Sequence, residues 1–245
     1  MKTVLTMAGS DPSGWAGVQA DILTFSFFGT RGLSAITAIT AQTEKGVKAI
    51  YPVQPRLLKR QVSALLDECR PDAVKIGMLG TVENAGAIKA LIQKWRLENV
   101  VLDPVLRSTG GYPLVGRKGM EAIKKLLPLV TVVTPNTQEA SVLSGINVNS
   151  VKDITEAAKV IRSLGCRYVL VKGGHLKGPP VDVLYDGKRF RYFKGRRIQG
   201  KPEEFHGTGC LLSSAVAAGL ANGKNVERAV KDAKGYVREI LRKRR

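Results

Sequence analysis

Residues 130–171 read VTVVTPNTQEASVLSGINVNSVKDITEAAKVIRSLGCRYVLV, and this stretch decides the fold. It begins with an apolar, β-branched run at Val130–Thr134 and ends with a second one at Tyr168–Val171. Between them apolar residues recur at helical spacing, and Gly165 follows as a C-terminal cap. A strand, a helix and a second strand in this order predict the repeating unit of a parallel sheet.

The same alternation continues toward both ends of the chain. Strands that helices cover on both faces are near-continuous apolar runs, and such runs occur at Val4–Met7, Ala35–Thr40, Ala73–Ile76, Val100–Leu102, Val130–Thr134 and Tyr168–Val171. Stripes of apolar residues at helical spacing predict helices within 56–69, 154–164 and 226–241.

A hairpin is predicted near the end of the pattern. Val181–Tyr185 and Arg189–Phe193 flank Asp186-Gly187, a dipeptide typical of a two-residue turn. We therefore predict an α/β fold in one domain over residues 1–245. Its three layers are a mostly parallel central sheet and the helices that flank it on both sides.

Composition restricts the class of protein. The apolar residues, 44% of the 245, suffice for a sizeable core, but no apolar run approaches the roughly 20 residues of a membrane span. The first residues carry no signal-peptide core, so we expect neither secretion nor a membrane partner. Three scattered cysteines and two histidines predict no disulfide framework and no structural zinc site, which favours a cytoplasmic protein.

The net charge of +19 is the most unusual global feature. It fits nucleic-acid binding, a basic solvated surface, or attraction of an anionic substrate such as ATP. The positive residues are spread over many predicted helices without interleaved aromatic residues, and only the tail at 242–245 forms a run. We therefore expect no nucleic-acid partner, and a basic tail of the kind that is often disordered.

Ligands of such sheets lie beyond the carboxyl ends of the strands, so the loops there hold the candidate residues. After the first strand, the glycine-rich segment 8–17 lets the backbone approach a ligand, although it lacks the Gly-Lys-Ser/Thr end of a Walker A loop. After the second, Gln42 offers a donor and an acceptor that suit a heteroaromatic ring. After the third, Met78 fits either a ring-packing or a core residue.

Charged side chains follow the later strands. Asp103 and Glu139 place carboxylates at the same sheet edge, the ligand type that holds Mg²⁺ beside phosphates, although each also fits an acidic residue at a helix start. Lys172 leaves its strand just before two glycines and can reach phosphate oxygens as a point charge.

The strongest local signal is FHGTGCLLSSAVAAG, residues 205–219. The turn at Gly207, Thr208 and Gly209 opens a helix of small apolar residues, whose free N–H groups and dipole form an anion site. Such a site stabilises the negative charge of a phosphoryl group in transfer. Cys210 lies in the first turn, where the pKa of a thiol is expected to fall, although taken alone it fits a small buried residue better.

In this order, the segments resemble the hydroxymethylpyrimidine/phosphomethylpyrimidine kinases of the ribokinase-like superfamily. The resemblance covers nearly the whole chain and rests on AGSDPSG (8–14), GVQAD (17–21), TAITAQ (37–42), KIGML (75–79), DPV (103–105), TPN with EA (134–140), KGGH (172–175) and HGTGC (206–210). It implies ATP-dependent phosphorylation of 4-amino-5-hydroxymethyl-2-methylpyrimidine, then of its monophosphate, in thiamine biosynthesis. It also implies an eight-stranded, mostly parallel sheet and a homodimer.

The resemblance implies a role for each candidate residue. Gln42 would bind the pyrimidine edge, and the pocket would be lined by Gly9, Asp21 and Met78. Asp103 and Glu139 would organise Mg²⁺ through water, and the ATP phosphates would be bound by Lys172, Thr208 and Gly209. The anion hole would comprise Gly207, Thr208 and Gly209.

Cys210 stands where ribokinase-like enzymes usually carry the aspartate that accepts the substrate's hydroxyl proton. A thiolate at a helix start can serve as that base. Because the monophosphate is already ionised, we expect Cys210→Ala to damage the first phosphorylation more than the second.

Two segments depart from the family pattern, Trp15 in place of a glycine and the stretch Arg107–Tyr112. Trp15 is expected to narrow the pocket or form a lid. Two rivals remain: a pyridoxal or pyridoxine kinase on the same scaffold, and a basic, non-catalytic binding protein. Gln42 and Met78 favour the pyrimidine over vitamin B6, and the set of catalytic residues argues against lost activity.

Overall fold

The computed structural model describes residues 1–244 except 44–45, 107–115, 175 and 177. The departure at Arg107–Tyr112, His175 of the KGGH motif and Arg245 of the basic tail therefore lie outside the described residues.

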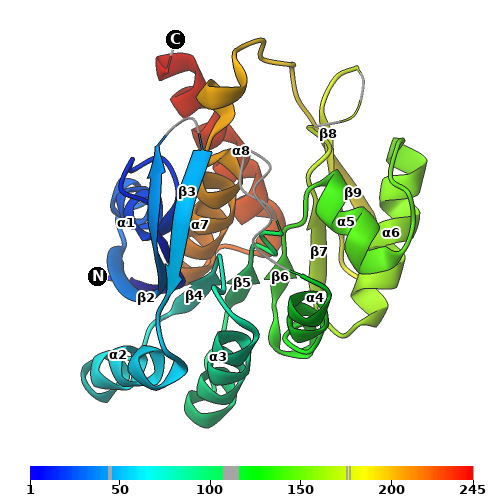
Figure 1. Ribbon diagram of the computed structural model, residues 1–245. Coiled ribbons are helices and arrows are strands. Elements are labelled where there is room, and N and C mark those ends of the chain that lie inside the picture. The colour runs from blue at the N-terminus through cyan, green and yellow to red at the C-terminus, as the bar shows by residue number, and fades with distance from the viewer. Residues whose placement is uncertain (44–45, 107–115, 175, 177, 245) are drawn as a thin grey trace.

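A mixed sheet forms the middle of the molecule (Figure 1). Within the described residues it has nine strands in the order β3-β2-β1-β4-β5-β6-β7-β8-β9. Their bounds are β1 Thr3–Ser10, β2 Arg31–Thr43, β3 Gly46–Pro52, β4 Ala73–Ile76, β5 Val100–Leu102, β6 Val132–Val133, β7 Tyr168–Val171, β8 Val181–Tyr185 and β9 Phe190–Lys194. Every strand predicted from an apolar run is confirmed.

The strands from β2 to β7 in this order pair in parallel, whereas β3, β8 and β9 are antiparallel to their neighbours. The expectation of eight strands is therefore wrong, because the sheet has nine within the described residues. The predicted hairpin is confirmed as β8–β9, but its loop is longer than two residues because Tyr185 pairs with Phe190. In this loop the Asp186 side chain accepts hydrogen bonds from two backbone N–H groups, those of Lys188 and Arg189.

Helices cover both faces of the sheet, which confirms the three-layer α/β architecture. One face carries α2 Pro55–Glu68, α3 Val82–Trp95, α4 Arg117–Lys124, α5 Thr137–Ser144 and α6 Val151–Ser163. The other carries α1 Gly17–Phe27, α7 Thr208–Ala221 and α8 Val226–Lys243. Apolar side chains of the strands alternate between these two layers, so each face has its own cluster of buried residues.

Helix α7 positions the site because it is buried along most of its length. All its residues from Leu211 to Ala221 are buried between the sheet and α8. Its small side chains allow close packing: a Cβ on Gly219 would lie 2.8 Å from Cβ of Ala229 in α8. A helix that is apolar all round belongs in a core, so the N-terminus of α7 is held rigidly at the carboxyl edge of the sheet.

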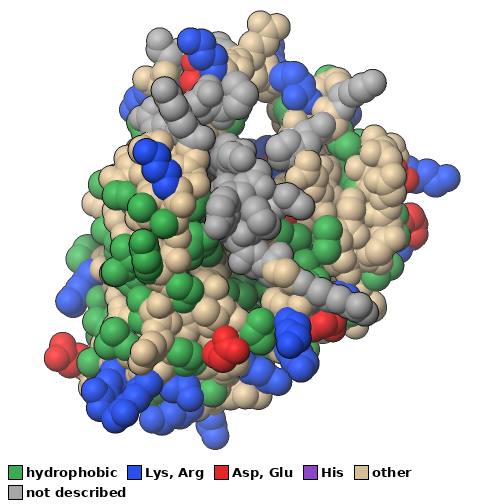
Figure 2. Space-filling view, in the orientation of Figure 1, with side chains coloured by type: hydrophobic (Ala, Val, Ile, Leu, Met, Phe, Trp, Pro, Cys, Tyr) green, Lys and Arg blue, Asp and Glu red, His purple; other side chains and the backbone are tan. Residues whose placement is uncertain are grey.

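The basic run predicted as a tail is ordered as far as Arg244. Helix α8 extends through Arg242 and Lys243, and Arg244 caps it. On the face drawn in Figure 2, lysine and arginine side chains gather mainly around the periphery, including the end near α2, rather than in one continuous stripe. Among the described residues, no helix combines the length and apolarity needed to cross a membrane.

Candidate functional site

A cavity of about 1440 Å³ opens at the carboxyl ends of the parallel strands. The ends of β2 and β3 and the loops after β1, β4, β5, β6 and β7 contribute to it, together with residues of α7 and α8. It is lined by ten of the residues predicted from sequence, namely Gly9, Gln42, Met78, Asp103, Glu139, Lys172, Gly207, Thr208, Gly209 and Cys210. Residues far apart in the chain are thus brought to one place, as the topology of a parallel sheet requires.

One end of the cavity has an apolar floor between β1 and β4, which are neighbours in the sheet although the chain visits β2 and β3 between them. A Cβ on Gly9 would lie 2.6 Å from the terminal methyl of Met78. The glycine therefore leaves room for the thioether to lie across the strand end. A flat, polarizable surface of this kind suits an aromatic ring.

Asp11 organises the loop above this floor. The buried carboxylate accepts hydrogen bonds from Ser13 at 2.7 and 2.9 Å and from the Ala16 N–H at 2.9 Å, and it lies 3.2 Å from Nε2 of His206. Burial opposes its ionisation, but the hydrogen bonds from His206, Ser13 and Gln42 hold the pKa of Asp11 well below its usual range. Gln42 is therefore oriented at the cavity wall by a fixed negative charge.

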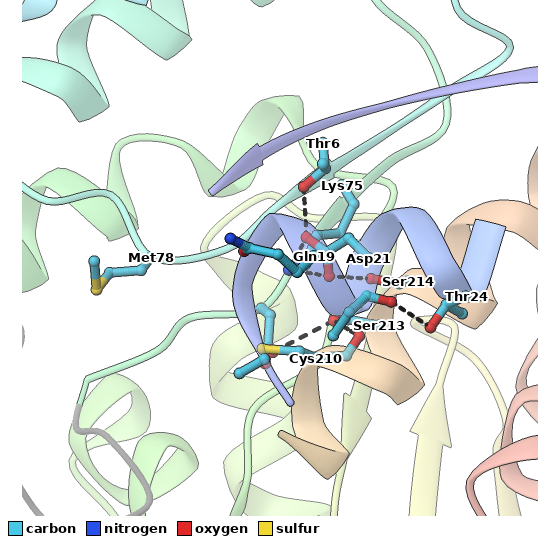
Figure 3. Close-up of polar contacts among 12 residues, drawn as sticks. Thr6, Gln19, Asp21, Thr24, Lys75, Met78, Cys210, Ser213 and Ser214 are labelled. Carbon is cyan, nitrogen blue, oxygen red and sulfur yellow. Dashed lines mark hydrogen bonds and ion pairs between the residues drawn. The ribbon is translucent and has the colours of Figure 1, made fainter. Parts of the chain in front are cut away.

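Asp21 differs from its predicted place, because it does not line the cavity. It is fully buried in α1 beneath the floor. Its carboxylate accepts hydrogen bonds from Lys75 at 2.8 and 2.9 Å, Thr6 at 2.6 Å and Ser214 at 2.5 Å (Figure 3). Although desolvation disfavours the ammonium, Asp21 raises the pKa of Lys75 above its usual range. Asp21 is thus the counter-ion of a buried lysine rather than a pocket wall.

The other end of the cavity holds a cluster of charges. Nζ of Lys172, at the end of β7, lies 3.0 Å from Oδ1 of Asp103 and 3.9 Å from Oε2 of Glu139. Ser213 of α7 lies 3.3 Å from the other oxygen of Asp103. Glu139 also forms a capping box with Asn136 at the start of α5. Burial and the nearby Asp103 raise the pKa of Glu139, while Lys172 opposes this effect.

The N-terminus of α7 faces this charge cluster. Gly207 is its N-cap with φ of 74°, and no side chain among the described residues caps the first turn. The Thr208 hydroxyl instead donates to the carbonyl of Phe205 at 3.0 Å. A Cβ on Gly209 would lie 3.2 Å from Nζ of Lys172. The missing side chain at Gly209 therefore lets the lysine approach the helix start, where the helix dipole favours an anion.

The predicted low pKa of Cys210 is wrong. The thiol borders the cavity in the first turn of α7, but burial raises its pKa to about 11. The Lys75 charge and a backbone hydrogen bond from Gly17 act in the opposite direction and do not compensate. Because loss of solvation outweighs the positive surroundings, Cys210 is a neutral thiol at ordinary pH.

Trp15 also differs from expectation. It is not among the described residues that line the cavity, whereas the next two residues, Ala16 and Gly17, are. Positive φ angles occur outside glycine only at Arg96 and Asn99 among the described residues, so Trp15 does not occupy a glycine-only conformation. The ring therefore neither narrows the described cavity nor strains the loop.

Three residues that organise the site, Lys75, Asp11 and His206, are not predicted by the local sequence motifs. Lys75 is the single charge in the otherwise apolar strand β4, a pattern that signals a buried ion pair. Asp11 and His206 lie within quoted motifs, but their pairing joins residues that are 195 positions apart. That contact follows from tertiary structure and leaves no local pattern.

Basic side chains line another part of the cavity. They come from the end of β9, from the segment after it and from α8: Lys194, Arg196, Arg197, Lys231, Lys234 and Arg238. Lys234 is paired with Asp182, which also accepts the N–H of Gly173 next to Lys172 at 2.9 Å. A cavity with an apolar floor, a helix N-terminus and basic side chains in its lining suits a small aromatic molecule beside a polyphosphate.

Comparison with known proteins agrees with this geometry. Residues 11–245 match the family model of phosphomethylpyrimidine kinase. The chain is 39% identical over 240 residues to a hydroxymethylpyrimidine/phosphomethylpyrimidine kinase of Aquifex aeolicus, covering 97% of this chain and 93% of the relative.

Solved structures of two kinds of kinase share the fold. Phosphomethylpyrimidine kinase from Clostridium difficile superposes with a TM-score of 0.87 and 39% identity, covering 98% of this chain and all of that one. Pyridoxal kinase from Staphylococcus aureus in complex with AMP-PCP and pyridoxal gives a TM-score of 0.88 and 37% identity, covering 97% and 86%. The chain is therefore similar both to pyrimidine kinases and to a vitamin B6 kinase.

Proposed function

The chain belongs to the phosphomethylpyrimidine kinase family, and we propose that it uses ATP to phosphorylate 4-amino-5-hydroxymethyl-2-methylpyrimidine and then the monophosphate, in thiamine biosynthesis. One observation carries this proposal: the ring floor at Gly9 and Met78 and the phosphate end at Lys172 and α7 belong to a single cavity. A pyrimidine on that floor points its substituent toward the helix N-terminus, with Gln42 at the ring edge.

The phosphate end has the charges that phosphoryl transfer needs. Backbone N–H groups of Gly207, Thr208 and Gly209 surround the transferring group, and Lys172 balances its charge from below. Lys172 also contacts Asp103, so its ammonium is already in place before substrate binds.

Asp103 and Glu139 fit a magnesium site of the kind that kinases use. Among the described residues no group of three or more potential ligands could enclose a metal. Two carboxylates at a cavity edge match Mg²⁺, which keeps several waters and binds substrate phosphates. Asp103 and Glu139 would hold Mg²⁺ there through water, and the ion would supply positive charge that offsets the charge of the phosphates.

The thiolate form of Cys210 accepts the alcohol proton in the first phosphorylation and becomes the neutral thiol. Its pKa of about 11 makes the thiolate scarce at neutral pH but strongly basic where it forms. In the second phosphorylation the nucleophile is an ionised phosphate, so no base is needed. The two steps therefore differ in their need for Cys210.

We further propose one kinase domain over residues 1–245, acting as a homodimer in the cytoplasm. The paired, exposed side chains of Ile39 and Tyr51 on β2 and β3 support association, because an apolar patch of this kind favours a protein contact. The three cysteines are free thiols, which supports a reducing compartment. Analytical ultracentrifugation of the purified protein tests the dimer.

A product assay tests the function. Purified protein is incubated with the pyrimidine alcohol, ATP and Mg²⁺, and the monophosphate and diphosphate are separated by ion-exchange chromatography. Both products are expected, with the monophosphate appearing first. Absence of both products, from the alcohol and from added monophosphate alike, would refute the proposal.

Phosphorylation of pyridoxal is the second candidate, because the S. aureus pyridoxal kinase shares the fold at 37% identity. Steady-state rates with pyridoxal and with the pyrimidine alcohol separate the two. We expect the larger kcat/KM for the pyrimidine, since the Gln42 amide matches its ring nitrogen and amino group.

A further inference from the structure

Two sequence features have no part in the site described so far: the tryptophan of the β1–α1 loop and the basic residues that end the chain. They meet in the structure. The guanidinium carbon of Arg244 lies 4.1 Å from the centroid of the Trp15 ring. A guanidinium at this distance over an indole face is attracted by the ring quadrupole, and tryptophan is the best ring for it.

Arg244 also holds the loop that leads into α7. Its Nη1 atom donates to the carbonyl oxygens of Glu204 at 3.0 Å and His206 at 2.7 Å. Arginine is suited to this double task, because its planar group presents donors at its edge and a flat face to a ring. One side chain thus ties the end of α8 to two loops that are far apart in sequence.

These two loops also touch each other at the phosphate-binding turn. A Cβ on Gly207 would lie 1.8 Å from the carbonyl oxygen of Trp15. Asp11 adds a second tie, because it accepts the N–H of Ala16 and contacts His206. The position of Gly207 therefore depends on where the backbone at Trp15 lies.

We propose that the side chains of Arg244 and Trp15 form a latch that holds the N-terminal turn of α7 in its phosphate-binding position. This inference rests on the proposed kinase function, which gives the turn its role. Neither side chain is among the described residues that line the cavity, so both are positioning residues. The latch supports the turn from outside, through the carbonyls of the loop before it and the backbone against which Gly207 packs.

Steady-state kinetics of the full chain test the latch. Arg244→Ala should lower kcat about tenfold, because a misplacement of about 1 Å far from the reacting atoms costs up to about 100-fold. KM for the pyrimidine alcohol should stay within about twofold, since the ring floor is untouched. Arg242→Ala is the matched control: it removes an exposed charge from the same helix end and should behave as the wild type.

Two further variants separate positioning from folding. Arg244→Lys keeps a cation near the ring but loses the planar donor fork, so kcat should be only partly restored. Trp15→Gly should lower kcat as Arg244→Ala does. The double variant should be no slower than the slower single one, because both changes break the same contact.

Tryptophan fluorescence separates the proposed positioning role from a purely structural one, because only the positioning role links the Trp15 emission to nucleotide binding. The chain has two tryptophans, and Trp95 lies in α3 on the opposite face of the sheet. Trp95→Phe leaves Trp15 as the single tryptophan. The Trp15 emission should change on titration with ADP, because nucleotide phosphates bound at the turn contact Gly207, which packs against the backbone of Trp15. Adding Arg244→Ala should remove most of that change.

The proposal fails if Arg244→Ala keeps kcat within about twofold of the wild type, or if the losses of the single variants multiply in the double variant. It also fails if Trp15 emission does not respond to ADP in the Trp95→Phe protein. If Arg244→Ala does not fold, the kcat values of Arg244→Lys and Trp15→Gly test the latch, and values within about twofold of the wild type contradict it. Wild-type protein without turnover would refute the kinase function instead, and the ADP titration would still test the latch.

Discussion

Gly209 offers the sharpest test of the phosphate end of the cavity. A Cβ at this position would lie 3.2 Å from Nζ of Lys172 and 3.6 Å from Oδ2 of Asp103. The first distance is shorter than an ordinary van der Waals contact, so in Gly209→Ala the ammonium must shift by a few tenths of an ångström. The backbone N–H at 209 is unchanged, so the anion hole keeps its donors while Lys172 moves.

The expected loss of activity follows from that displacement. Removing one transition-state donor altogether costs about 100- to 1,000-fold in kcat. A displaced ammonium retains part of its effect, so we expect kcat to fall about tenfold, or about 1.4 kcal/mol in the barrier. The free energy of unfolding of Gly209→Ala should rise or stay unchanged. Gly209 lies in a helix and has no positive φ, so alanine is favoured there by up to about 1 kcal/mol.

The assay pairs steady-state kinetics with urea denaturation. Gly86→Ala is the matched control, since Gly86 is exposed in α3 and a Cβ there would meet nothing within 4 Å. It should gain stability and keep full activity. An unchanged kcat in Gly209→Ala, or an equal loss in Gly86→Ala, would show that the close approach of Lys172 to the helix start does not matter for transfer.

Four further outcomes are expected. Lys75→Met should lower the free energy of unfolding by about 3–5 kcal/mol, because it leaves the Asp21 carboxylate buried without its counter-ion. Urea denaturation measures this loss, and the double variant Lys75→Met/Asp21→Leu should recover most of it. A loss below about 1 kcal/mol in Lys75→Met would contradict the buried pair. The first phosphorylation should accelerate as pH rises from 7 to 9, because the Cys210 thiolate fraction grows up to its pKa of about 11, whereas the second should stay flat. Cys210→Ala should remove that slope and damage the first step more than the second; equal loss in both steps argues against a base at this position. Cys210→Asp should preserve the first step and depress the second, as product chromatography from the alcohol and from the monophosphate would reveal.

Much of the fold follows from local patterns, and the exceptions have a physical reason. The apolar runs of the central strands are buried by helices on both faces, so their sequence alone identifies them. Strand β3 was missed, because an edge strand with the sequence GVKAIYP is only half covered and ends in proline. Its pairing with β2 is a tertiary contact that local propensity does not encode.

The same limit separates the site residues that were placed correctly from those that were not. Positions at the carboxyl ends of strands are fixed by topology, and Asp103 and Lys172 after β5 and β7 reach the cavity, as does Gln42, which lies within the end of β2 rather than after it. Burial is not fixed in this way. Asp21 lies beneath the floor because Lys75, which is 54 residues away, needs a counter-ion. Cys210 has a raised pKa because burial reduces the solvation of its thiolate, an effect that a helix-start pattern cannot reveal.

The neutral thiol at Cys210 has a consequence for a kinase that takes two substrates in turn. In the second step a phosphate of almost two negative charges occupies the place that the alcohol had in the first. A carboxylate at this position would repel it by about 4 kcal/mol per charge at 4 Å in a typical protein dielectric. A thiol whose pKa is raised to about 11 carries no such charge at neutral pH. Under the proposed mechanism, the burial that makes the Cys210 thiolate scarce as a base for the alcohol therefore also lets the monophosphate return to the same site.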